Sequence, residues 1–197
     1  IFLELSKIRK GPRFVETLID MHRLHLLPTI FEPLKKMPLN ELEARLKAAH
    51  SFSSNVSMLL FLAQLFDDVF LSSMPKFLKT SNEEARVIEV FLHLKHKKLA
   101  SLELADLAEL FSDPLFDVAF EALSKDSQEK AWVEEKKKEL HFFIEKLQKN
   151  EPFLRAKDLE EIGVKPGKEM GRLLNEAKRK AINMNLHDKE AILRELT

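Results

Sequence analysis

Apolar residues recur along the chain at the three- and four-residue spacing of amphipathic helices, and Val and Ile never cluster in the alternating runs typical of strands. Leu and Phe dominate the apolar residues, and only four residues are Gly. This composition favours helices packed on helices. The pattern predicts an all-α protein, a multi-helix array of about eight to ten helices with no sheet.

Proline, glycine and polar capping residues set the expected helix boundaries. A break at Lys10, Gly11 and Pro12 separates the first two helices. Asn40, with Glu43 three residues later, has the spacing of a capping box. The polar residues at 80–82, followed by two acidic residues, are expected to cap a helix that runs through His96. The expected helices cover residues 1–10, 12–26, 39–49, 55–71, 82–96, 101–111, 114–123 and 127–149, and two shorter helices are expected after Pro152.

Residues 55–71 form a nearly continuous apolar run. The run is too long for a strand and too short to span a membrane, so it predicts a helix that is buried on most sides. We expect this segment to be the core helix, with Asp67 and Asp68 marking its exposed edge.

The 32 basic and 32 acidic residues give a net charge of zero, but they are unevenly distributed. Residues 1–13 contain four basic residues and one acidic residue, and residues 163–180 contain six basic and two acidic residues. Residues 101–130 contain eight acidic and two basic residues. The basic ends predict local positive faces that could bind a polyanion, and solvated helix faces without a partner are the open alternative.

The composition also bears on location. Cysteine is absent, which excludes disulfides and thiolate metal sites and is compatible with a reducing compartment, so we expect the cytoplasm. No apolar stretch reaches the roughly 18–20 residues of a membrane span, and the first residues lack the order of a signal peptide. The chain begins at Ile1 inside an expected helix, so we expect a fragment of a longer protein.

Two histidine pairs have the spacing that places both rings on one helical face: His22 with His25, and His93 with His96. Neither pair has the acidic partner and third ligand of a recognisable metal site. We therefore expect surface or half-buried histidines and no metal ligands.

The segment after Pro152 contains three of the four glycines, Gly163, Gly167 and Gly171. Gly163 is expected to end a short helix in a left-handed cap, and Gly167 to complete a turn after Pro166. Gly171, inside the next helix, is expected to let another backbone approach closely. The pattern predicts a helix, a tight loop and a second helix.

This hairpin is the candidate binding element. Its loop amides and the positive N-terminus of its second helix could hold a phosphate, with basic side chains around it. The alternative is a hairpin packed against the body with lysines that only confer solubility. The predicted RNA-binding residues are Lys165, Gly167, Lys168, Arg172, Lys178, Arg179 and Lys180.

Residues 152–159 (PFLRAKDL) and 163–174 (GVKPGKEMGRLL) resemble the C-terminal motif of the bacterial-type (class II) CCA-adding enzymes, the tRNA nucleotidyltransferases, and related poly(A) polymerases. Residues 4–8 (ELSKI), with Glu4 and Lys7, are similar to the neck motif of that family, and residues 78–84 (LKTSNEE) to a motif of its body. The chain departs from the family at Ala156, where Gly is usual, and at Lys168, where Pro is usual.

The resemblance implies neck helices at residues 1–27, a helical body at 28–150 and a helical tail at 151–197. It implies a transferase that adds nucleotides to RNA 3′ ends, as in CCA addition during tRNA processing, with Mg²⁺ bound in a head domain that this chain lacks. It places no catalytic residue and no cofactor in the chain itself. The implied partner is tRNA or another structured RNA, without DNA or a membrane.

Two other functions remain open. One is a helical protein-interaction scaffold whose Phe-rich surface docks a partner helix without RNA binding. The other is an enzyme with its own active site in the helices, which the lack of a converging acid–base, nucleophile or metal set disfavours. The choice between CCA, CC-only, A-only and poly(A) addition would depend on the head domain.

Overall fold

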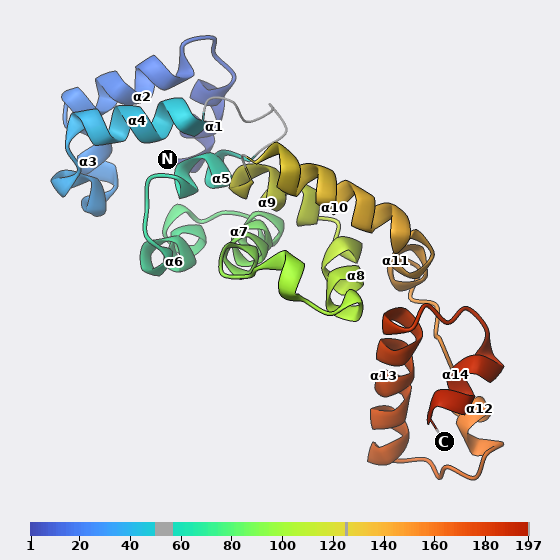
Figure 1. The fold of residues 1–197 in the computed structure, drawn as a ribbon. Coiled ribbons are helices and arrows are strands. Elements are labelled where there is room, and N and C mark those ends of the chain that lie inside the picture. Colours follow the sequence, from blue (N-terminus) through green and yellow to red (C-terminus); the bar gives the residue numbers. More distant parts are fainter. Residues whose placement is uncertain (50–56, 125, 197) are drawn as a thin grey trace. The chain divides into compact units, whose positions relative to one another are not determined.

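The computed structural model describes residues 1–49, 57–124 and 126–196. These residues form fourteen α-helices and two short 3₁₀ helices, with no strand among them (Figure 1). The all-α prediction is confirmed, whereas the expected number of helices was too low. None of the described helices combines the length and the apolar character needed to cross a bilayer.

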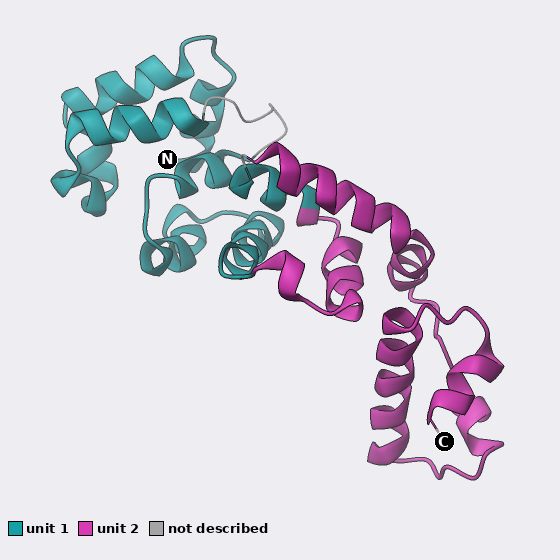
Figure 2. Ribbon diagram, in the orientation of Figure 1, with its two compact units in different colours: residues 1–97, 117–125 teal, residues 98–116, 126–197 magenta. Residues whose placement is uncertain are grey.

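The chain divides into two compact units (Figure 2). Unit 1 contains the described residues of 1–97 and 117–125, and unit 2 those of 98–116 and 126–197. The boundaries of these units differ from those of the neck, body and tail that the family resemblance implies, so that division stays a prediction.

Unit 1 begins with three helices and a 3₁₀ turn, continues with four further helices, and includes most of α9 from a later part of the sequence. Its elements are α1 (Phe2–Arg9), α2 (Phe14–Arg23), α3 (Leu26–Ile30), η1 (Glu32–Lys36), α4 (Leu39–Ala49), α5 (Met58–Ala63), α6 (Asp68–Leu78), α7 (Asn82–Lys95) and α9 (Phe116–Leu123).

Unit 2 contains one helix from the middle of the chain and the helices of the C-terminal third. Its elements are η2 (Leu99–Ser101), α8 (Leu104–Ser112), α10 (Ser127–Glu139), α11 (His141–Gln148), α12 (Ala156–Glu160), α13 (Lys168–Asn183) and α14 (Lys189–Leu196).

The additional helices arise where a single residue leaves helical geometry or caps a new helix. The helix expected at 12–26 ends at Arg23, and His25, with a φ of 58°, is the N-cap of the additional helix α3. Leu140 (φ −93°, ψ 5°) separates α10 from α11 within the expected 127–149 helix. In the tail, the Asp188 side chain accepts a hydrogen bond from the amide of Ala191 at 2.9 Å and begins a third helix, α14.

The expected core helix is only partly correct. Asn55 and Val56, at its start, lie outside the described residues, and the helical part that follows, α5, has all six residues buried. Asp67 does not mark the end of that helix, because its side chain accepts a hydrogen bond from the Phe70 amide at 2.8 Å and begins α6. A local cap therefore competes successfully with the continuous apolar pattern.

Capping was predicted correctly at one helix and wrongly at another. The amide of Glu84 donates to Ser81 Oγ at 3.2 Å and the Ser81 amide donates to Glu84 Oε2 at 2.9 Å, a complete capping box that opens α7. Asn40, in contrast, lies inside α4, which begins at Leu39.

The core of unit 2 brings α8 together with α11 and α13. Phe111 and Phe116 lie edge to face with ring centroids 4.9 Å apart, and the rings of Phe143 and Phe153 stack at 6.1 Å. Helix α14 packs on α13. This packing fixes α13, the second helix of the predicted hairpin, against an acidic helix and leaves the loop before it exposed.

Candidate RNA-binding hairpin

The predicted hairpin forms from α12, the loop at residues 161–167 and α13. Gly163 has a φ of 91° and its amide donates to the Glu160 carbonyl at 2.9 Å, while the Val164 amide donates to the Leu159 carbonyl at 3.0 Å. These two bonds form a Schellman motif, so the left-handed cap expected at Gly163 is confirmed.

The other two glycines of the hairpin differ from each other. Gly167 is the N-cap of α13 and has a φ of 151°, a conformation that side chains disfavour. Gly171 lies inside α13, is exposed, and has open space within 4 Å of the position of a Cβ atom. The expected close backbone approach at Gly171 is therefore wrong.

The exposed loop side presents two lysines. Lys165 and Lys168 are both exposed, and neither has an ion-pair partner among the described residues. They flank Gly167, so both cationic residues lie within two positions of the N-cap of α13, a sixteen-residue helix with a positive N-terminus. Among the predicted RNA-binding residues, these two lysines are the ones whose charge is not paired within the described chain.

Arg172, one turn into α13, is partly neutralised by its neighbours. Its guanidinium contacts Glu169 at 2.7 Å and Glu176 at 2.9 Å. The hydrogen bond from Arg172 holds the pKa of Glu169 below its usual value. Both acids lie on the same helix, so a bound polyanion would compete with them for this arginine.

Lys178 and Arg179 face the acidic helix α8. Lys178 Nζ lies 2.5 Å from Glu109 Oε1, and Arg179 contacts both Asp106 at 2.7 Å and Glu103 at 2.6 Å. The carboxylates of Asp106 and then Glu103 raise the pKa of the Arg179 guanidinium. These two predicted RNA contacts are occupied within unit 2.

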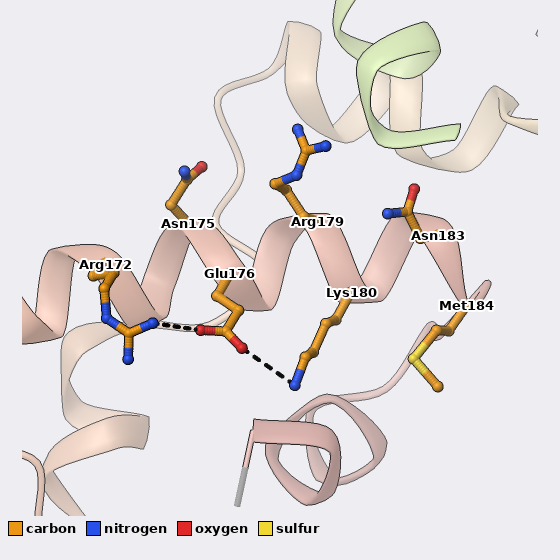
Figure 3. Close-up of a pocket in the computed structure, with 7 residues that line it drawn as sticks. All are labelled: Arg172, Asn175, Glu176, Arg179, Lys180, Asn183 and Met184. Atoms are coloured by element: carbon orange, nitrogen blue, oxygen red, sulfur yellow. Dashed lines mark hydrogen bonds and ion pairs between the residues drawn. The ribbon is translucent and has the colours of Figure 1, made fainter. Parts of the chain in front are cut away.

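Lys180 is engaged on the other side of α13. Its ammonium lies 3.3 Å from Glu176 Oε1 and donates to the backbone carbonyl of Glu195 on α14. Figure 3 shows Glu176 between Arg172 and Lys180 along the helix. These residues line a shallow hollow of about 440 Å³ together with Asn175, Arg179, Asn183 and Met184.

Asn183 has a structural role that the sequence reasoning missed. Its Oδ1 accepts a hydrogen bond from the Ala105 amide at 2.8 Å, and its Nδ2 donates to Glu103 Oε2 at 2.9 Å. Helix α8 has no side-chain cap of its own, so Asn183 of α13 caps it from 78 residues away. No local pattern could have indicated a cap that is so distant in sequence.

The predicted neck residues and the two histidine pairs lie in unit 1. Glu4 and Lys7 are exposed on α1 and form an ion pair of 2.8 Å, which lowers the pKa of Glu4. His22 is buried, contrary to expectation, and its Nε2 lies 3.1 Å from the Met37 carbonyl. His25 and His93 are exposed.

His96 belongs to a small ionic cluster at the end of α7. Its Nε2 lies 2.7 Å from Asp68 Oδ2, and Lys95 Nζ lies 2.5 Å from the other oxygen of the same carboxylate. The hydrogen bond from Lys95, and then that from His96, lowers the pKa of Asp68. In the part of the chain that the structure describes, no three His, Asp or Glu residues form a group that could hold a metal ion.

Comparisons with family models, curated proteins and solved structures give no match for this chain. The resemblance to CCA-adding enzymes therefore rests on the motifs of the sequence.

Proposed function

We propose that this chain binds tRNA or another structured RNA, as the C-terminal part of an enzyme of the tRNA nucleotidyltransferase and poly(A) polymerase family. In this proposal it positions the RNA for nucleotide addition at the 3′ end by a head domain outside the chain, in the cytoplasm. The Mg²⁺ of the reaction would belong to that head domain.

The observation that carries the proposal is the loop between α12 and α13. Lys165 and Lys168 lie exposed and without ion-pair partners among the described residues, beside Gly167 and the N-terminus of α13. Backbone amides at a helix N-terminus, combined with lysines, suit the phosphates of a nucleic-acid backbone. Such contacts read the shape of an A-form helix and not its base sequence.

The ion pairs of α13 reduce the number of predicted RNA-binding residues that could contact a phosphate. Lys178 and Arg179 pair with α8, and Lys180 with Glu176 and α14, so these side chains are not free for phosphate. The proposed contact is therefore the loop with Lys165, Gly167 and Lys168, while Arg172 would contribute only by leaving its acidic neighbours.

The test is the binding of the chain to a tRNA that lacks its 3′ end, measured by fluorescence anisotropy at several salt concentrations. Lys165→Glu with Lys168→Glu should weaken binding and reduce the slope of log K against log salt by about one for each lysine. Lys130→Glu with Lys138→Glu on α10 is the matched control. It makes the same charge change at two exposed lysines that also lack ion-pair partners in the described chain.

Equal losses in the two double variants would show that the effect is one of net charge, and the loop would not be the binding site. The scaffold function would then lead, since Val69 and Phe77 of α6 are 82% and 48% exposed. That function predicts binding of a partner helix without RNA affinity.

A further inference from the structure

A second group of cations lies in unit 2, outside the predicted RNA-binding residues. It lines a hollow of about 520 Å³ formed by the last part of α11, residues 151–155 and the first residue of α14. This volume is within the range of about 300–1,000 Å³ of small-molecule sites. The lining residues are Lys146, Glu151, Pro152, Phe153, Arg155 and Lys189.

One buried carboxylate contacts two of the three cationic residues, Lys189 through its side chain and Arg155 through its backbone amide. Asp158 is only 8% exposed; its Oδ1 lies 2.5 Å from Lys189 Nζ, and its Oδ2 accepts a hydrogen bond from the Arg155 amide at 2.6 Å. The bond from Lys189, and then that from the Arg155 amide, lowers the pKa of Asp158. Asp158 therefore fixes both the Lys189 ammonium and the backbone from which the Arg155 side chain extends.

The third cation is held by aromatic rings. Lys146 Nζ lies 5.1 Å from the ring centroid of Phe153 and 5.8 Å from that of Phe142. Cation–π contacts position an ammonium without neutralising its charge. Lys146 therefore retains its full charge toward the hollow.

The charges of the lining favour an anion. Neither Lys146 nor Arg155 has a carboxylate partner among the described residues, and Glu151 is the one acid in the lining. Glu151 forms no ion pair with these cations within the described structure. Three cations stand against two carboxylates, Glu151 and the Asp158 that pairs with Lys189, so the hollow keeps a net positive charge. A guanidinium together with ammonium groups suits the oxygens of a phosphate.

We propose that this hollow is a phosphate-binding site. Arg155 and Lys146 bind the phosphate oxygens, Lys189 adds charge from its position on Asp158, and Asp158 acts as a positioning residue. Two sources supply the same chemistry: a small phosphorylated molecule, or a backbone phosphate of the RNA in the proposed function. Glu151 limits the affinity because its carboxylate repels the ligand.

The experiment is an NMR titration of the full chain with inorganic phosphate, with chloride at equal ionic strength as reference. Saturable shifts are expected at the amides of residues 146, 153, 155 and 189. Arg155→Gln and Lys146→Gln should each weaken phosphate binding about tenfold, because each removes a charge-assisted hydrogen bond. Glu151→Gln should strengthen it, and the matched control Lys138→Gln should leave it unchanged.

Absence of saturable shifts in the unaltered chain would overturn the proposal. So would equal phosphate affinity in Arg155→Gln, whose unchanged melting curve would show that the variant is folded. The proposal would also be contradicted if Glu151→Gln raised the affinity for phosphate while Arg155→Gln and Lys146→Gln left it unchanged, because the three cations would then not form the site.

A second arm distinguishes the two sources. If Arg155→Gln also weakens binding of the tRNA that lacks its 3′ end (the trimmed tRNA), and reduces the slope of log K against log salt by about one, the bound phosphate belongs to RNA. If tRNA binding is unchanged while phosphate binding is lost, the ligand is a small phosphorylated molecule. The variant Lys165→Glu with Lys168→Glu should keep phosphate binding at this hollow, so failure of the hairpin proposal and failure of this one give different results.

Discussion

Arg179 of α13 donates a hydrogen bond from Nη1 to Asp106 Oδ1 of α8 at a distance of 2.7 Å. The same guanidinium reaches Glu103, and the neighbouring Lys178 reaches Glu109. The basic end and the acidic middle of the sequence therefore meet within unit 2. The sequence alone predicts that the basic residues of α13 form a binding surface. In the structure, Lys178 and Arg179 instead form part of the contact between α13 and α8.

Replacing Asp106 by Asn should test whether the acids of α8 compete with RNA for the basic residues of α13. The change removes one carboxylate from Arg179, whose side chain is about a third exposed, so we expect a modest loss of about 0.5–1 kcal/mol in the free energy of unfolding. RNA affinity at low salt should rise, because α13 becomes more positive. Urea unfolding and anisotropy with trimmed tRNA measure the two effects.

The control for this charge change is Glu135→Gln on α10, an exposed carboxylate without a partner in the described chain. An equal gain in RNA affinity for Glu135→Gln would show that only the net charge matters. No gain for Asp106→Asn would mean that α13 does not contact RNA even when it is released.

Gly171→Ala should stabilise the chain by about 0.5–1 kcal/mol. Gly171 lies inside α13 with open space around the Cβ position, so Ala adds helix propensity without a clash. Gly163→Ala is the contrasting variant and should destabilise by about 1–2 kcal/mol, because its φ of 91° is unfavourable for a side chain. Thermal and urea unfolding of both variants give the comparison, and a destabilised Gly171→Ala would indicate a contact that the structure lacks.

Asn183→Ala should destabilise unit 2 by about 1 kcal/mol, because the Ala105 amide at the start of α8 loses its cap. Asn175→Ala, at an exposed position of the same helix, is the matched control and should be neutral or slightly stabilising. The difference between the two variants in urea unfolding isolates the cap. Equal stabilities would show that water replaces Asn183 without loss.

Asp158 should make the stability of the chain depend on acid pH. Its folded-state pKa is lowered from 3.8 by Lys189 and the Arg155 amide, so its contribution is complete above the unfolded pKa and is lost as pH falls through the folded value. The stability difference between the unaltered chain and Asp158→Asn should be largest near pH 6 and should shrink below about pH 4.

Urea unfolding of the two proteins at a series of pH values from 7 to about 2.5 tests this prediction. Asp68→Asn provides a comparison, because the pKa of Asp68 is also lowered but by an exposed cluster in unit 1. A difference for Asp158→Asn that stays constant down to the lowest pH would show that the carboxylate charge is not what stabilises the fold.

The sequence alone determined the features that depend on local backbone chemistry. Helix spacing and the lack of alternating runs predicted an all-α protein, the polar and acidic residues at 80–84 predicted the start of α7, and Gly163 predicted a left-handed helix end. These succeed because the interacting atoms lie within a few residues of each other, so the pattern and the contact are the same information.

The tertiary structure alone decided which charged and polar groups meet. Lys165 and Lys168 read in the sequence like Lys178 and Arg179, yet the first pair is exposed and the second lies against acids about 70 residues earlier. The cap that Asn183 supplies to α8 and the pair of Lys189 with Asp158 also join residues far apart in sequence, by 78 and 31 positions. A basic side chain is neutralised by an acidic side chain that packs beside it. Hydrophobic burial between helices decides which side chains meet, and this leaves no local pattern in the sequence.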